Sequence, residues 1–162
     1  MRSLIGRFGL FVAGVGVGIL LMQPGAAQTT PGPGLRLSHV GVFAKNYDES
    51  LRFYTNVMGL REAFTVRDKD GKPTLTYLQI SKEAFLELSP ANGRPVGLSH
   101  VGIWPVNLDA TVAALRQRGI TVGDPRAGTT RITNATDPDG IRLELLDFLP
   151  DSEPRKAMDS WK

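Results

Sequence analysis

The chain has 162 residues, of which 41% are hydrophobic and 22% are charged, a composition that fits one globular domain and excludes a disordered or collagen-like chain and a membrane protein with many spans. The absence of cysteine excludes disulfides, thiolate zinc sites and thiol nucleophiles. Without Arg2 and Arg7, the 19 basic residues fall to 17 against 16 acidic ones, and no basic cluster remains to bind nucleic acid.

The first 27 residues are predicted to form a signal peptide (residues 1–27). Two arginines precede an uncharged stretch from Phe8 to Met22, and Gly25-Ala26-Ala27 offers small residues for cleavage. An uncleaved anchor is the alternative, but several glycines and a proline make this stretch a poor spanning helix. Residues 28–34 are predicted to be a linker. We therefore expect an exported, periplasmic or secreted protein with no membrane contact after cleavage.

The rest of the chain contains an internal repeat. Leu37-Ser38-His39-Val40-Gly41-Val42 returns 61 residues later as Leu98-Ser99-His100-Val101-Gly102-Ile103. Such a repeat predicts two copies of one structural unit, each beginning with a strand. A unit of this size buries too little surface to be stable alone, so the two copies should pack together.

A helix is expected after the first strand of each copy. Asp48 and Asp109 are suited to be the N-caps, and Gly59 and Gly119 are suited to end the helices. Apolar stripes are expected at Leu51, Tyr54 and Met58 on the first helix, and at Val112 and Leu115 on the second.

Three short strands are expected after each helix. In the first copy they are Arg61–Arg67, Leu75–Ser81 and Ala84–Leu88; in the second they are Thr121–Val122, Thr129–Asn134 and Ile141–Phe148. Each copy is then a βαβββ module, the first over 35–90 and the second over 97–148. Together they make a single domain over 35–148, and the polar tail 149–162 is expected to contain a short docked helix.

The two histidines of the chain, His39 and His100, occupy the same place in the repeated strand. Strand alternation puts His39 on the face of Leu37 and Gly41, and it puts His100 on the face of Leu98 and Gly102. The glycine two residues after each histidine should clear space beside an imidazole.

A glutamate also recurs, in the last strand of each copy. Glu87 and Glu144 each lie between leucines, where an unpaired carboxylate would be costly to bury. One divalent cation would compensate both carboxylates, and the two imidazoles would complete a four-ligand set. Mixed nitrogen and oxygen ligands suit nickel, cobalt, zinc, manganese or iron(II). A lone strand histidine or glutamate is usually structural, but the symmetric recurrence of both favours a metal site.

Other residues are candidates for substrate binding. Tyr77 and Gln79 alternate with apolar residues, Trp104 could line a pocket or pack in the core, and Arg142 could bind an anionic substrate or pair with an acid. The full set of candidates is Phe43, Tyr77, Gln79, Trp104 and Arg142.

The sequence resembles the vicinal oxygen chelate superfamily of glyoxalases, bleomycin resistance proteins and dioxygenases. The resemblance lies in the duplicated His-Val-Gly strand, Phe53-Tyr54, Gly59-Leu60, and Asp137-Pro138-Asp139-Gly140 leading to Glu144. It implies an α+β fold of two paired βαβββ modules, whose curled mixed sheets enclose a metal cavity. The ligand positions of the family fall on His39, Glu87, His100 and Glu144.

This ligand set looks most like that of bacterial glyoxalase I. That resemblance implies a metal-stabilised enediolate, with Glu144 as the base and Glu87 as its partner, although the two could exchange roles. Glyoxalase I has an arginine and an asparagine for glutathione where this chain has Phe43 and Ala91. We therefore expect a metal-dependent lyase, isomerase or epimerase that acts on a different small substrate with adjacent oxygens.

Two alternatives stay open within the same family. One is a small-molecule binding or resistance protein without turnover, and the other is an extradiol dioxygenase, although this chain lacks a third histidine. Methylmalonyl-CoA epimerase is disfavoured by the expected export and by its glutamine at the second ligand position. The two modules could pair within one chain or exchange partners in a homodimer.

Overall fold

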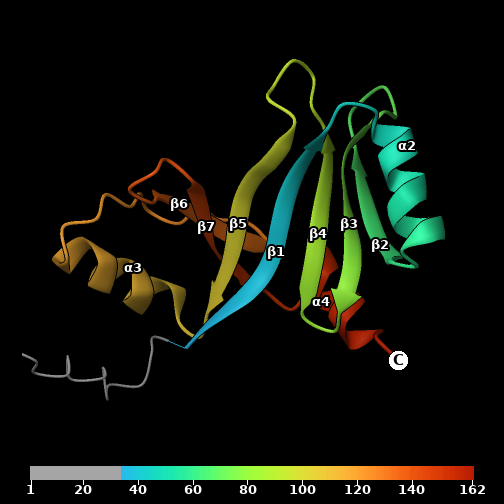
Figure 1. Ribbon diagram of the computed structural model, residues 1–162. Helices are drawn as coiled ribbons and strands as arrows, with labels where there is room; N and C mark the ends of the chain where they lie inside the picture. The colour runs from blue at the N-terminus through green and yellow to red at the C-terminus, as the bar shows by residue number, and fades with distance from the viewer. Residues whose placement is uncertain (1–33) are drawn as a thin grey trace, which may run out of the picture. The chain divides into compact units, whose positions relative to one another are not determined.

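A mixed β-sheet of seven strands forms the body of the described chain (Figure 1). The computed structural model describes residues 34–162, so the predicted signal peptide and nearly all of the linker lie outside the described residues. The first copy contributes β1 (Leu35–Ala44), β2 (Arg61–Arg67), β3 (Pro73–Ser81) and β4 (Ala84–Pro90), and the second contributes β5 (Gly97–Pro105), β6 (Thr130–Thr136) and β7 (Arg142–Phe148).

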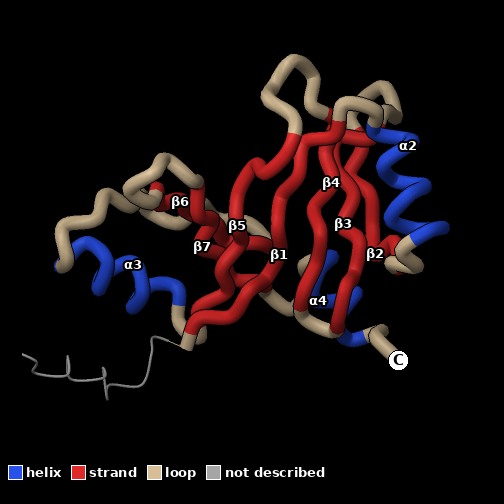
Figure 2. Tube along the Cα trace, in the orientation of Figure 1, coloured by secondary structure: helices blue, strands red, loops and turns tan. Residues whose placement is uncertain are grey.

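The two copies join edge to edge within one chain. The strand order is β2-β3-β4-β1-β5-β7-β6, with β1 antiparallel to β5 and each of these two parallel to the last strand of its own copy. The sheet is curled but not closed (Figure 2). This arrangement confirms the predicted α+β fold of paired modules.

Two helical segments each cover one part of the outer face of the sheet. The first is α2 (Tyr47–Arg52), which continues as the π-helical turn η1 (Phe53–Val57), and the second is α3 (Leu108–Gln117). Leu51 and Tyr54 pack over β3 and β4, and Val112 and Leu115 pack over β5 and β7, as predicted. The prediction was wrong for Met58, which is 59% exposed because it follows the last turn of η1.

Both helices begin two residues earlier than predicted. The N-caps are Asn46 and Asn107, whose side chains accept hydrogen bonds from the backbone of Glu49 and Ala110. Asp48 and Asp109 lie instead in the first turns, where a negative charge favours the helix dipole. The predicted ends are confirmed, since Gly59 and Gly119 follow the helices with φ of +73° and +80°.

The second copy has one strand fewer than predicted. Thr121–Val122 is irregular, and the carbonyl of Val122 accepts a hydrogen bond from the Arg116 side chain rather than from a neighbouring strand. Pro125 has no N–H to donate to a ladder, so only the single bridge between Arg126 and Ile132 forms beside β6.

The tail contains the expected short helix, α4 (Glu153–Asp159), which buries Pro154, Ala157 and Met158. It packs on the face of the sheet opposite α2 and α3 (Figure 1). Within residues 34–162, no helix has the length and hydropathy needed to span a membrane.

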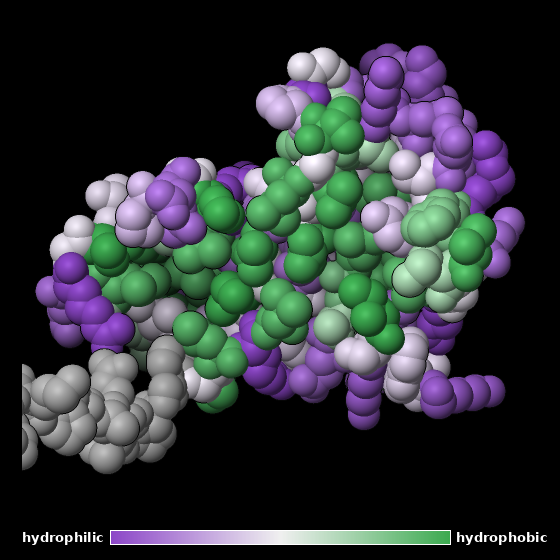
Figure 3. All heavy atoms as spheres, in the orientation of Figure 1, coloured by the Kyte–Doolittle hydropathy of each residue, from purple (hydrophilic) through white to green (hydrophobic). Residues whose placement is uncertain are grey.

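The outer face between α2 and α3 is hydrophobic (Figure 3). There, side chains of β1 and β5 lie over the middle of the sheet without a covering helix. Leu37 is 51% exposed and Leu98 is 54% exposed. We refer to this region, Leu37 and Leu98 with the neighbouring Val40, Val42, Val101 and Ile103, as the outer strip.

Candidate metal centre

A β-bulge precedes each histidine and sets the face on which it lies. The pairing of β1 with β5 shifts between Leu37 and His39 and again between Gly41 and Val42, opposite the step from His100 to Leu98. Ser38 and Ser99 are the extra residues. Each bulge reverses the alternation, so the prediction that Leu37 and Leu98 share the face of the histidines was wrong.

Each glycine of the repeat makes room for the histidine of the other copy. Gly41 lies opposite His100 and Gly102 lies opposite His39 across the β1–β5 pair. A methyl group on either glycine would overlap the opposite imidazole. The predicted clearance is therefore confirmed, but it acts between strands and not along one strand.

The glutamates lie in the same two rows across the sheet. Glu87 pairs with Gly41 in the parallel β1–β4 ladder, and Glu144 pairs with Gly102 in the parallel β5–β7 ladder. One row is therefore Glu87, Gly41 and His100, and the other is His39, Gly102 and Glu144. Both rows point their side chains to the inner face, and an approximate two-fold axis between β1 and β5 relates them.

The four side chains converge on one point. The Nε2 atoms of His39 and His100 are 2.7 Å apart, and the Glu144 Oε2 lies 3.5 Å from both. The Glu87 Oε2 is 3.7 Å from the first Nε2 and 3.9 Å from the second. The imidazoles are buried, whereas the side chains of Glu87 and Glu144 are 14% and 11% exposed. The centre is therefore reached from the carboxylate side.

The bulge serines orient both imidazoles. The Oγ of Ser38 is 3.2 Å from Nδ1 of His39, and the Oγ of Ser99 is 2.9 Å from Nδ1 of His100. For His39, a serine oxygen that accepts the Nδ1–H leaves the free lone pair on Nε2, the nitrogen that faces the centre. Ser99 can play the same part for His100 only when the proton of that imidazole is on Nδ1. Sequence reasoning missed these residues, although their recurrence in the repeated hexapeptide was the signal that could have found them.

Arg142 breaks the symmetry of the site. Its guanidinium lies 3.1 Å from Oε1 of Glu144 and 2.8 Å from Nδ1 of His100. Because arginine can only donate, this contact places the proton of His100 on Nε2, from which it can be given to Nε2 of His39. If a cation binds through both Nε2 atoms, the proton of His100 must therefore move from Nε2 to Nδ1. The Nδ1–H would then be donated to the Ser99 hydroxyl, and the contact with Arg142 would be lost.

Burial and the neighbouring charges shift the pKa of three groups. Burial lowers the pKa of His100 to about 4, so this imidazole is neutral at pH 7. Burial also raises the pKa of Glu87. For Glu144, burial raises the pKa, but the nearby imidazoles and the charge of Arg142 lower it on balance. The two carboxyl groups are thus chemically distinct despite their symmetric positions.

The donor set fits a divalent transition metal. Ligand atoms of His39, Glu87 and His100 all lie within 4.8 Å of one another, and Glu144 approaches both imidazoles. Neutral imidazoles and carboxylates are the ligands that zinc, iron, cobalt, nickel and manganese accept. The glycines opposite the imidazoles further indicate that the backbone is shaped around this cluster.

We predict that Ser38→Ala and Ser99→Ala each weaken metal binding about tenfold, because loss of an outer hydrogen bond frees the imidazole to turn. Isothermal titration with Zn²⁺ measures the change. Ser81→Ala, at the exposed end of β3, is the matched control. Equal affinities for all four chains would show that the serines do not orient the ligands.

The other predicted site residues divide into two groups. Tyr77 and Phe43 lie on the inner face: the Tyr77 ring centroid is 5.4 Å from that of His39, and Phe43 packs under the guanidinium of Arg94. Gln79 and Trp104 are buried, and the contacts of their side chains are with residues other than the four candidate ligands. Gln79 bonds to Arg61 and to the carbonyl of Ala157, and Trp104 packs against Phe148, which is the core alternative considered for it.

The sequence was compared with protein-family models and with known proteins. A family model described as Glyoxalase/Bleomycin resistance protein/Dioxygenase superfamily matches residues 36–145. A probable lactoylglutathione lyase of Vibrio parahaemolyticus is 30% identical over 123 residues, which make up 68% of this chain and 89% of that protein. The lactoylglutathione lyase of Salmonella typhimurium is 28% identical over 127 residues, with 70% and 93% covered.

Solved structures share the fold at lower sequence identity. Methylmalonyl-CoA epimerase from Mycobacterium tuberculosis matches with a TM-score of 0.60 and 22% identity, covering 70% of this chain and 88% of that one. A variant of the Streptomyces coelicolor epimerase, in complex with 2-nitronate-propionyl-CoA, matches with a TM-score of 0.59 and 23% identity, covering 70% and 94%. Because the family model matches most of its length, the chain belongs to the Glyoxalase/Bleomycin resistance protein/Dioxygenase superfamily.

Proposed function

We propose that this protein is a metal-dependent lyase, isomerase or epimerase that acts on a small molecule with two adjacent oxygens. The observation that carries the proposal is the convergence of two imidazole Nε2 atoms and two carboxylates on one point of the inner face. The relatives named lactoylglutathione lyase and methylmalonyl-CoA epimerase support an enzyme of this kind.

We propose that His39, Glu87, His100 and Glu144 hold the cation. When bound, a divalent metal supplies Lewis-acid stabilisation of the negative charge that develops on adjacent substrate oxygens. Glu144 acts as the base that removes a proton from the substrate carbon, and Arg142 keeps this carboxylate ionised. Glu144 then returns the same proton to the substrate, with Glu87 as its partner carboxylate at the centre.

The proposed substrate is not the glutathione adduct suggested by the names of the relatives. Phe43 and Ala91 replace the arginine and asparagine expected for glutathione. Ala91 is buried, and its N–H bonds to the carbonyl of Ala44, so it presents no polar side chain. Arg94 and Arg142 instead supply guanidinium groups near the inner face, and these favour an anionic substrate.

Metal content tests the proposal. We expect about one transition-metal ion per chain in the purified protein, or after anaerobic loading, and none in the His39→Ala, His100→Ala double variant. Elemental analysis beside the protein concentration gives this ratio. Absence of metal in the wild-type chain would overturn the enzyme proposal, and metal without turnover on any vicinal-dioxygen substrate would favour the binding protein.

We also propose that the protein is exported and forms a homodimer. The charge and hydropathy pattern of residues 1–27 supports export, and Edman sequencing of protein from the native host would check it by finding an N-terminus near residue 28. The exposed outer strip supports a homodimer, since the same apolar patch on two copies of the chain can pair with itself. Light scattering gives the molar mass in solution: the wild-type chain is expected to be a dimer and Leu98→Glu a monomer.

A further inference from the structure

The C-terminal helix α4 lies outside the part of the chain that matches the family, residues 36–145. It is nevertheless built into the domain. The side chain of Ser152 caps its N-terminus by accepting from the N–H of Arg155, and Pro154 occupies its first turn. Ala157 and Met158 face the sheet and are 7% and 2% exposed.

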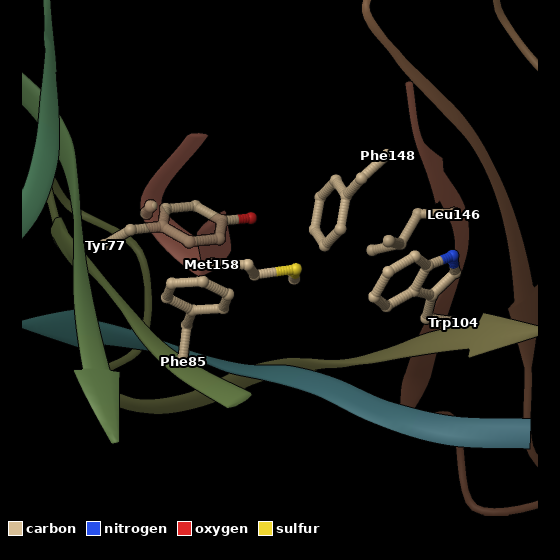
Figure 4. Packing of buried hydrophobic residues seen from close by; sticks show 7 residues of the cluster. Tyr77, Phe85, Trp104, Leu146, Phe148 and Met158 are labelled. Atoms are coloured by element: carbon tan, nitrogen blue, oxygen red, sulfur yellow. The ribbon is translucent and has the colours of Figure 1, made fainter. Parts of the chain in front are cut away.

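These two residues fill one end of the inner face. Figure 4 shows Met158 between the aromatic rings contributed by the first copy and those contributed by the second. The cluster around it consists of Tyr77, Phe85, Trp104, Leu146 and Phe148. We refer to α4 and this cluster together as the α4 wall.

Polar contacts hold the wall in place. Arg61 donates to the carbonyl of Ala157 at 2.9 Å, and the buried amide of Gln79 donates to the same oxygen at 3.4 Å. The guanidinium of Arg155 lies 4.9 Å from the ring centroid of Trp104. The substrate-binding candidates Gln79 and Trp104 thus serve to fix the helix.

The α4 wall directly adjoins the candidate metal ligands. Tyr77 pairs with Glu87 across β3 and β4, and Phe85 pairs with His39 across β4 and β1. Trp104 follows Gly102 by two residues on the inner face of β5. Met158 is therefore separated from the ligands by a single layer of aromatic side chains. Arg142 lies on the other side of the centre, at the beginning of β7.

We propose that the α4 wall determines substrate size: a bound molecule directs a short apolar group toward Met158 and an anionic end toward Arg142. This proposal rests on the proposed function and makes it more specific. The substrate class is then a short-chain α-oxygenated carbonyl compound that carries an acidic group. A long or aromatic substituent on the α4 side would collide with Tyr77, Phe85 and Trp104.

Two hydroxamates of different size, both of which chelate through adjacent oxygens, test the proposal on cobalt-loaded protein. We expect the wild-type chain to bind acetohydroxamate more tightly than benzohydroxamate, measured by the change in the visible cobalt spectrum. Met158→Ala should tighten benzohydroxamate binding about tenfold and leave acetohydroxamate unchanged. Met158→Val removes less volume and should give a smaller gain, which keeps the test open if the alanine variant does not fold.

Met58→Ala is the matched control, because Met58 is 59% exposed and lies outside the wall. An equal gain in this control, or no gain in folded, cobalt-loaded Met158 variants, would overturn the proposal while leaving the proposed function intact. If the wild-type chain binds neither cobalt nor acetohydroxamate, the proposed function fails, and the proposal for the α4 wall fails with it.

Discussion

Gly102→Ala should weaken metal binding by about 100-fold, and Gly41→Ala should do the same. A methyl group at Gly102 would occupy space that the imidazole of His39 fills, and one at Gly41 would displace His100. The strand pair cannot spread to make room, because the β1–β5 ladder fixes the separation of the opposed residues. The histidine must therefore leave its rotamer, and its Nε2 leaves the centre.

Gly123→Ala is the control for this experiment. Its added methyl would meet only the Thr133 hydroxyl at an ordinary 3.6 Å. Competition with a chromophoric zinc chelator gives the affinities of the wild-type chain and the three variants. Thermal unfolding of the metal-free chains separates loss of the site from loss of the fold. If Gly102→Ala folds and binds metal as the wild-type chain does, His39 does not direct Nε2 to the proposed centre.

The repeated hexapeptide predicted two copies of one unit that pack together, and the resemblance to the vicinal oxygen chelate superfamily implied how they pair. Two copies of one strand with a histidine, each followed by a helix and a strand with a glutamate, leave few ways to bury all four polar groups. Joining of the copies through the repeated strands then brings the four side chains together. The symmetric part of the fold and of the candidate site was therefore accessible from the sequence.

Features that depend on strand register could not be predicted from the sequence. The bulges at Ser38 and Ser99 turn Leu37 and Leu98 to the outer face, and simple alternation cannot reveal an extra residue. Which glycine faces which histidine also depends on the antiparallel register of β1 and β5. The candidate ligands were chosen from the sequence, but their partners across the sheet required the structure.

The differences between the two copies of the repeat could not be predicted from the sequence either. Thr121–Val122 has a β-branched pattern, but the following Gly123-Asp124-Pro125 prevents a ladder, and the helix instead binds this segment through Arg116. Arg142 contacts Glu144 and His100, while no equivalent contact is found for Glu87 and His39 among residues 34–162. Composition and spacing treat the two copies alike, so they cannot assign different roles to their glutamates.

This asymmetry leads to a prediction for Glu144→Gln, which should lower the rate of substrate deprotonation about 1000-fold. The amide keeps the size of the side chain but cannot accept a proton, and the guanidinium of Arg142 loses its ionic partner. Exchange of the carbon-bound hydrogens of dihydroxyacetone with D₂O, followed by NMR on zinc-loaded protein, measures this step directly.

Glu87→Gln is the matched comparison, because both carboxylates approach the same two imidazoles. The rate of substrate deprotonation should fall less in Glu87→Gln than in Glu144→Gln, since Glu144 and its contact with Arg142 are unchanged. Bound zinc must be measured in both variants, so that loss of metal is not mistaken for loss of the base. Equal losses in metal-loaded variants would mean that the carboxylates share the role, and a larger loss in Glu87→Gln would assign the base to the first copy of the repeat.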